Sequence, residues 1–203
     1  CLLLYRLVRG FAASSLTGLC AALLYGLHPV HTGAISYIAG RADPLAGVFL
    51  LVAISCHRKA VASGLRWPAI GAVAAYAAAL LSREHAVVFI GAVGAAHVAW
   101  RERRGLPLLL LYLAITVGYG LLRKGLFPEL VVDTSLGTLP ERLPGFFVAF
   151  ARYLRILIWP FPLQVDYGVA YFPWSDPRAI WGVALFLTFT LAAGGLLWRK
   201  PSI

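Results

Sequence analysis

The sequence predicts an all-α protein, a polytopic bundle of transmembrane helices. Of its 203 residues, 61% are hydrophobic and only 13% are charged, whereas a soluble domain is about 25% charged. The mean hydropathy is +0.81. The basic residues form short clusters between apolar runs, which is typical of cytoplasmic membrane loops. The formal charge of +10 therefore indicates membrane loops, and no nucleic-acid partner is expected.

About six spans and one interfacial helix are expected along the chain. A helix rises about 1.5 Å per residue, and the hydrocarbon core of a bilayer is about 30 Å thick. Asp43 and Pro44 favour a helix start, with Asp43 as the N-cap. The expected spans are residues 1–9 (the last turns of a helix), 11–28, 44–59, the two halves of 67–100, 106–122 and 179–198.

Residues 146–161 are expected to form an interfacial or re-entrant helix that follows a loop over residues 125–145. Arg152 and Arg155 lie at its centre, and one central Arg costs at least ~2.5 kcal/mol on insertion scales. The two side chains share one helix face because they are three residues apart. They either snorkel from an amphipathic helix or contact anionic lipid.

The charge distribution predicts which loops face the cytoplasm. Alternating the spans puts ten basic residues and only one acid, Glu102, on one face, which the positive-inside rule makes cytoplasmic. Residues 28–43, 82–85 and 125–178 then face the opposite side, where seven of the eight acids gather. The chain lacks Met, so we expect an internal piece of a longer protein, with a single transmembrane domain over residues 1–203.

Two loops on the extracytoplasmic side carry the main candidate residues. Arg41 lies two residues before Asp43, and this pair is either a helix cap with a local ion pair or a phosphate site. A guanidinium suits phosphate because it is planar and permanently charged. Arg83 and Glu84 interrupt a nearly uncharged stretch, either as the polar tip of a helical hairpin or as functional residues at membrane depth. We expect Arg41, Arg83 and Glu84 to converge on one cavity near the membrane surface, where Glu84 neutralises one of the two arginines and leaves the other free for a ligand.

Three further residues are substrate-binding candidates, namely His31, Arg155 and Asp166. His31 pairs with His28 around Pro29, but no third ligand has matching spacing, so helix-end histidines are favoured over a metal site. Asp166 follows a proline in a loop, where Asp is usually a turn residue. No cofactor is expected.

Residues 27–54 resemble the membrane domain of the TMTC-type protein O-mannosyltransferases and their bacterial relatives, within the GT-C superfamily. The tip sequence of residues 82–87 resembles that family's Ser-Lys-Glu hairpin tip, with Arg83 in the Lys position. The stretch 152–167 resembles the segment that follows the family's seventh span. Gly33 departs from the pattern, because the family commonly has Glu there. The matching residues of the first motif are His28, Pro29, His31, Thr32, Gly40, Arg41, Ala42 and Asp43.

The resemblance implies a GT-C-like glycosyltransferase domain that uses a polyprenyl-phosphate-linked sugar. Arg41, with Arg83 or Arg155, would then neutralise the leaving phosphate. The catalytic carboxylate of such enzymes lies in the first extracytoplasmic loop, which is expected upstream of Cys1, so no catalytic residue is assigned. The expected partners are membrane lipid, the lipid-linked sugar, and a protein acceptor or partner membrane subunits.

Two other functions compete with transfer. One is a non-catalytic integral membrane subunit or scaffold that retains the fold. The other is a transporter, which is disfavoured because no inverted repeat is visible. An excess of 15 Arg over 3 Lys favours a bacterial inner membrane, with the endoplasmic reticulum membrane as the alternative.

Overall fold

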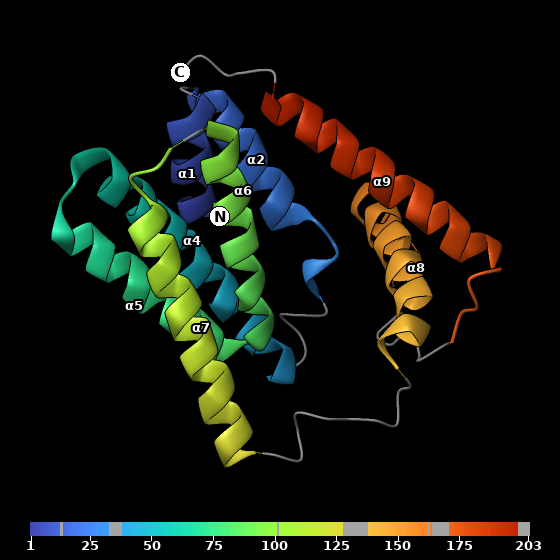
Figure 1. The fold of residues 1–203 in the computed structure, drawn as a ribbon. Coiled ribbons are helices and arrows are strands. Elements are labelled where there is room, and N and C mark those ends of the chain that lie inside the picture. Colours follow the sequence, from blue (N-terminus) through green and yellow to red (C-terminus); the bar gives the residue numbers. More distant parts are fainter. Residues whose placement is uncertain are drawn as a thin grey trace. The chain divides into compact units, whose positions relative to one another are not determined.

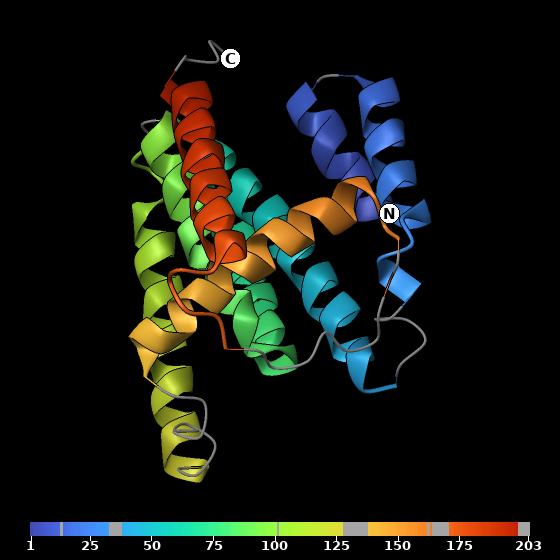
Figure 2. The same ribbon diagram turned by 90° about the vertical axis from the view of Figure 1, so that its right-hand side faces the viewer.

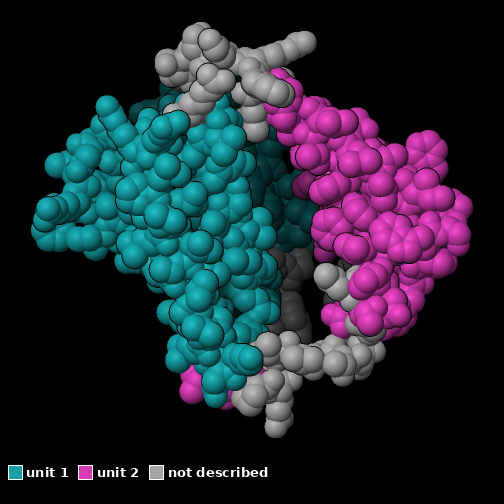
Figure 3. Space-filling model, in the orientation of Figure 1, with its two compact units in different colours: residues 1–125 teal, residues 126–203 magenta. Residues whose placement is uncertain are grey.

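The computed structural model describes residues 1–12, 14–32, 38–100, 102–127, 138–161, 163 and 171–198. Every regular element in these residues is helical, which confirms the all-α part of the prediction (Figure 1). The chain divides into two units, residues 1–125 and 126–203 (Figure 3). The first contains α1 (Leu2–Ala12), α2 (Ser15–Leu27), η1 (Ile38–Arg41), α4 (Ala42–Ser63), α5 (Arg66–Ser82), η2 (Glu84–Val87), α6 (Val88–Trp100) and α7 (Leu106–Leu126), and the second contains α8 (Leu139–Ile158) and α9 (Pro177–Trp198).

The described residues support three membrane spans and not six. By length and composition, Ala42–Ser63, Leu106–Leu126 and Pro177–Gly195 are long and apolar enough to cross a bilayer. The helices at the other expected spans are too short to cross a bilayer. The helix α2 has 13 residues and rises only about 20 Å, since the run 11–28 is broken before Ser15. The helix α6 also has 13 residues.

Small residues join α4 and α5 into a hairpin with closely approaching backbones (Figure 1). Fully or nearly fully buried alanines lie on both helices, including Ala46 and Ala53 on α4 and Ala72 and Ala79 on α5. Without a hydrophobic force between helices in lipid, such small-residue seams provide the van der Waals contact that holds them together. The turn is possible because Gly64 adopts φ +68° and donates its backbone N–H to the carbonyl of Ala60.

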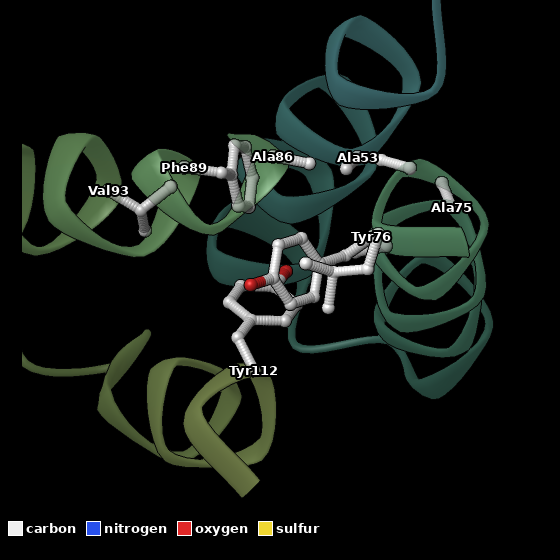
Figure 4. Packing of buried hydrophobic residues seen from close by; sticks show 10 residues of the cluster. Ala53, Ala75, Tyr76, Ala86, Phe89, Val93 and Tyr112 are labelled. Carbon is white, nitrogen blue, oxygen red and sulfur yellow. The ribbon is translucent and has the colours of Figure 1, made fainter. Parts of the chain in front are cut away.

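An aromatic cluster attaches α6 and α7 to this hairpin. The rings of Tyr76, Phe89 and Tyr112 come from three different helices and lie together (Figure 4). Their centroids are 5.1 to 5.5 Å apart, in the range of favourable aromatic pairs. The Tyr76 hydroxyl also lies 2.6 Å from the hydroxyl of Thr116, so its polar end is satisfied.

The second unit is a pair of helices, α8 and α9, that cross obliquely (Figure 2). Gly182 of α9 is buried where the two backbones meet, against the carbonyl of Phe147. The helix α8 begins at Leu139, seven residues before the expected start at 146. Glu141 accepts the backbone N–H of Thr138 at 2.7 Å, so a capping motif starts the helix inside the segment expected to be a loop. The placement of α8 along a membrane surface stays a prediction.

Candidate functional site

An ion pair joins the start of α4 to the turn between α5 and η2. The Arg83 Nε lies 2.6 Å from Asp43 Oδ1, and Arg83 Nη2 donates to Asp43 Oδ2 at 3.3 Å. Of the two contacts only the one from Nη2 has the geometry of a hydrogen bond, and the shorter approach of Nε to Oδ1 is an ion-pair contact. The side chains are 39% and 40% exposed, so solvent screens their attraction. The pair fixes a position more than it adds stability.

A second ion pair joins η2 to the end of α7. The Glu84 carboxylate contacts the guanidinium of Arg123, which also donates to the Tyr119 hydroxyl at 3.3 Å. His85 lies 3.9 Å from Asp43. The sequence suggested Glu84 as the neutralising partner for Arg41 or Arg83. In the structure Arg83 pairs with Asp43, and Glu84 pairs with Arg123. Charged residues from α4, η2 and α7 therefore meet at one end of the first unit.

Arg41 lies two residues before Asp43 of this charged cluster. It is the last residue of η1, and its side chain is exposed. In the described part of the chain no carboxylate pairs with it. The helix α4 begins at Ala42, with Arg41 itself at the cap position, so the expected N-cap role of Asp43 was wrong. The physical reason is that the backbone is already helical at Arg41, with φ −61° and ψ −22° at the end of η1, so Asp43 lies inside the first turn of α4 and not at the extended position of an N-cap.

His31 has an aromatic environment. Its ring centroid lies 4.3 Å from that of Tyr25 and 6.4 Å from that of His28. His28 caps the end of α2, and its Nδ1 accepts the backbone N–H of Val30 at 3.2 Å. These contacts hold the two histidines at a helix end.

The two remaining candidates belong to the second unit. Arg155 is exposed on α8 and lines a pocket with Arg152 and Arg178. Asp166 lies outside the described residues.

A buried histidine pair was missed by sequence reasoning, in which His57 was only a residue near the end of the expected span 44–59. His57 of α4 and His97 of α6 are both buried, and their Nε2 atoms are 2.9 Å apart. His97 Nδ1 lies 2.9 Å from the carbonyl oxygen of Glu102, and His57 Nδ1 lies 3.1 Å from the hydroxyl of Tyr112. The four groups form one hydrogen-bond chain across three helices and a turn.

The carbonyl of Glu102 determines which group is the donor in each hydrogen bond of this series. A carbonyl only accepts, so His97 Nδ1 carries the proton, and Nε2 of the neutral ring accepts. His57 must then donate from Nε2, which leaves its Nδ1 to accept from Tyr112. A spacing signal for burial was present, because His57 lies four residues after Ala53 and three before Ala60, on the face of the alanine seam.

The coupling between Asp43 and Arg83 is measurable. Asp43→Ala and Arg83→Ala should each lower the free energy of unfolding slightly, and the double variant should lose less than the sum. The expected coupling is ~0.2–1 kcal/mol, as for other partly exposed ion pairs. Thermal unfolding of the four proteins in one detergent checks it. Strictly additive losses would show that the contact does not form in solution.

Comparison with known proteins shows partial, distant similarity. No family model and no solved structure matches the chain. The protein O-mannosyl-transferase TMTC3 of Mus musculus is 30% identical over 121 residues, which is 58% of this chain and 13% of that protein. The human TMTC3 is 30% identical over 117 residues, covering 56% of this chain and 12% of the human protein.

A third relative, the protein O-mannosyl-transferase tmtc2 of Xenopus laevis, is 41% identical over 54 residues, 27% of this chain and 6% of that protein. The chain thus spans between 6% and 13% of the length of the curated relatives described here. The resemblance suggested by the motifs is confirmed: this chain is a distant relative, over a small part of their length, of the TMTC protein O-mannosyl-transferases.

Proposed function

We propose that this chain forms part of a membrane glycosyltransferase. It would transfer a sugar from a polyprenyl-phosphate donor to the hydroxyl of a protein or other acceptor, on the extracytoplasmic side. The observation that carries the proposal is that Arg41 is exposed and lies two residues before Asp43, the residue that pairs with Arg83. Similarity to protein O-mannosyl-transferases supports the reaction class. The bacterial inner membrane, favoured by the excess of Arg over Lys, is part of the proposal.

Arg41 would act on the phosphate of the donor. When the bond between the sugar and the phosphate oxygen breaks, the electron pair stays on that oxygen and negative charge grows there. A guanidinium already in place stabilises this charge without reorganisation. The acceptor hydroxyl forms the new bond to the sugar, and its proton goes to a base that the family resemblance places upstream of Cys1.

The other residues of the cluster would hold Arg41 in place and shape the site. Asp43 is two residues away on the same turn, and its contact with Arg83 ties that turn to the hairpin tip. Glu84 ties the tip to α7 through Arg123. His31 is proposed to contact the sugar or the acceptor. Asp166 remains a predicted contact in its loop, and Arg155 remains a predicted contact of the leaving phosphate.

The test is the substitution Arg41→Ala in the full-length protein that contains this chain, assayed with a polyprenyl-phosphate sugar. Losing a transition-state contact to a developing charge should lower the transfer rate by roughly 10²-fold or more. Arg41→Lys should recover only part of the rate, because it keeps the charge but loses the planar fork.

Arg66→Ala is the matched control, since Arg66 is also exposed at a helix start but lies at the other end of α5 from the charged cluster. It should leave the rate unchanged. Unchanged transfer by Arg41→Ala would contradict the assigned role. Absence of any transfer by the folded wild-type protein would favour the scaffold alternative.

A further inference from the structure

The buried histidine pair joins α4, α6 and the turn before α7 in the first unit. His57 is 5% exposed and His97 is 9% exposed, and their Nε2 atoms lie 2.9 Å apart. The proposed transfer function uses neither residue. Imidazole is the side chain whose ordinary pKa, about 6.5, lies closest to neutral pH. A buried pair of imidazoles is therefore a place where protons can control a contact between helices.

The hydrogen bonds of the pair fix where its protons lie. The carbonyl of Glu102 accepts from His97 Nδ1, so His97 Nε2 has only a lone pair and accepts from His57 Nε2. His57 Nδ1 then accepts from the hydroxyl of Tyr112, which is fully buried in the aromatic cluster of Figure 4. Each ring therefore carries one proton, and the two rings are opposite tautomers.

Added protons are incompatible with this arrangement. A proton on His97 Nε2 would place two N–H groups head to head across 2.9 Å, which is a repulsive contact and not a hydrogen bond. A proton on His57 Nδ1 would reverse the hydrogen bond with Tyr112 and would put a cation among buried groups. Both rings can become cations only when they separate.

The rings cannot separate without moving the turn. Gly105 is buried against them, and a Cβ at this position would lie 2.1 Å from His97 Cε1 and 3.2 Å from His57 Nε2. The backbone N–H of Glu102 also donates to the carbonyl of His97 at 3.1 Å. Turn and ring are thus held together, and separation of the rings releases the turn and the end of α6 from α4.

The surrounding charges do not stabilise added protons. In the described part of the chain no carboxylate lies within ion-pair distance of either imidazole. The Glu102 carboxylate accepts the backbone N–H of Arg104 at 2.9 Å. Arg58 is directed at an aromatic ring of α1, Cys56 faces α5, and the Tyr76 hydroxyl is bonded to α7. The other described cations of α4, of the start of α5 and of the turn are exposed, namely Lys59, Arg66, Arg103 and Arg104.

We propose that His57 and His97 form an acid-sensitive latch, which holds α6 and residues 102–105 against α4 while both imidazoles are neutral and releases them when both are protonated. The latch goes beyond the proposed transfer function, because neither histidine belongs to the charged cluster around Asp43. Its turn carries Glu102 and so lies on the face predicted to be cytoplasmic.

The sign of the pH dependence follows from proton counting. The released state binds up to two more protons than the closed state, so acid favours release. Release should begin as the pH falls below about 6.5, where a free imidazole takes up its proton. For two protons the opening constant should rise by up to ~100-fold per pH unit.

Nitrogen NMR of the full chain in detergent, with its histidines labelled, tests the proton positions. At neutral pH, His97 should be the Nδ1–H tautomer and His57 the Nε2–H tautomer. As the pH falls towards about 5, both rings should become imidazolium in one concerted step. The same tautomer on both rings, or protonation of one ring without the other, would overturn the latch.

Hydrogen exchange, corrected for the intrinsic rate at each pH, measures the release. The backbone amides of residues 102–109 should lose protection over the pH range in which the rings are protonated. The amide of Gly64, which donates to the carbonyl of Ala60 in the α4–α5 turn, should keep its protection. Equal loss at Gly64 would indicate general acid unfolding and would contradict a local latch.

His57→Gln separates titration from packing. A Gln amide can donate or accept, so it can bond to His97 Nε2 in either protonation state. This variant should therefore stay closed in acid. His85→Gln is the control, because His85 is exposed and lies outside the pair, and it should open as the wild type does. Wild-type acid release in His57→Gln would overturn the proposal, and the tautomers of the wild type decide it if that variant does not fold.

Discussion

Gly105→Ala is expected to destabilise the first unit strongly. A Cβ at this position would lie 2.1 Å from Cε1 and 2.3 Å from Nε2 of His97, far inside van der Waals contact. The imidazole cannot move aside without losing hydrogen bonds, because His57 and Glu102 hold both of its nitrogens. Displacing the ring leaves buried donors and acceptors without partners, at a cost of about 1–3 kcal/mol each. We expect a loss on the order of 3 kcal/mol.

Thermal unfolding measures this loss, and ~3 kcal/mol corresponds to a decrease in Tm of roughly 6–12 °C for a chain of this size. Gly118→Ala is the control, since a Cβ on Gly118 of α7 meets nothing within 4 Å. A double variant makes the test specific. In a His97→Ala background the clash is absent, so adding Gly105→Ala should cost little. Additive losses in this cycle would show that the clash with His97 is not the cause.

Gly182→Ala is expected to separate α8 from α9. The added Cβ would lie 2.3 Å from the carbonyl oxygen of Phe147 and 2.5 Å from its carbonyl carbon. Both are backbone atoms, so relief requires moving a whole helix and not a side chain. Overpacking of this kind typically costs ~1–3 kcal/mol and occasionally more, and a contact between backbones lies at the upper end.

Limited proteolysis in detergent detects the separation, as faster cleavage in the second unit of Gly182→Ala. Gly182→Leu should accelerate cleavage further, because its side chain is larger. Gly194→Ala, on the same helix with nothing within 4 Å of the added Cβ, should be cleaved like the wild type. Unchanged cleavage of Gly182→Leu would contradict the close approach of the two helices.

The sequence was sufficient for features that depend on local composition. The all-α class and the three long spans follow from apolar runs, and the polar tip at Arg83 and Glu84 follows from one interruption in such a run. The number of spans was overestimated, because hydropathy averages across helix ends. Residues around Ser14 look continuous in composition, although Ser14 accepts the backbone N–H of Thr17 and starts a new helix there.

Pairings between residues far apart in the chain could not be predicted from the sequence. Asp43 and Arg83 are forty residues apart, and so are His57 and His97. Nothing in a single sequence says which acid meets which base, so Glu84 was assigned to the wrong arginine. The capping motif at Thr138 and Glu141 was different, because its four-residue signature was present and was overlooked.

Two polar contacts of α4, made by Asp43 and by His57, together fix the register of that helix. Asp43 contacts Arg83 at its first turn, and fourteen residues later, about 21 Å along the axis, His57 joins the chain to Tyr112. Between them Ala46 and Ala53 are buried in the seam, and Phe49, Leu50, Val52 and Ile54 pack against the core cluster. With both ends engaged, a shift by one residue would turn the helix by ~100° and release both contacts together. The fourteen-residue spacing between Asp43 and His57 therefore fixes the register of α4 against its neighbours.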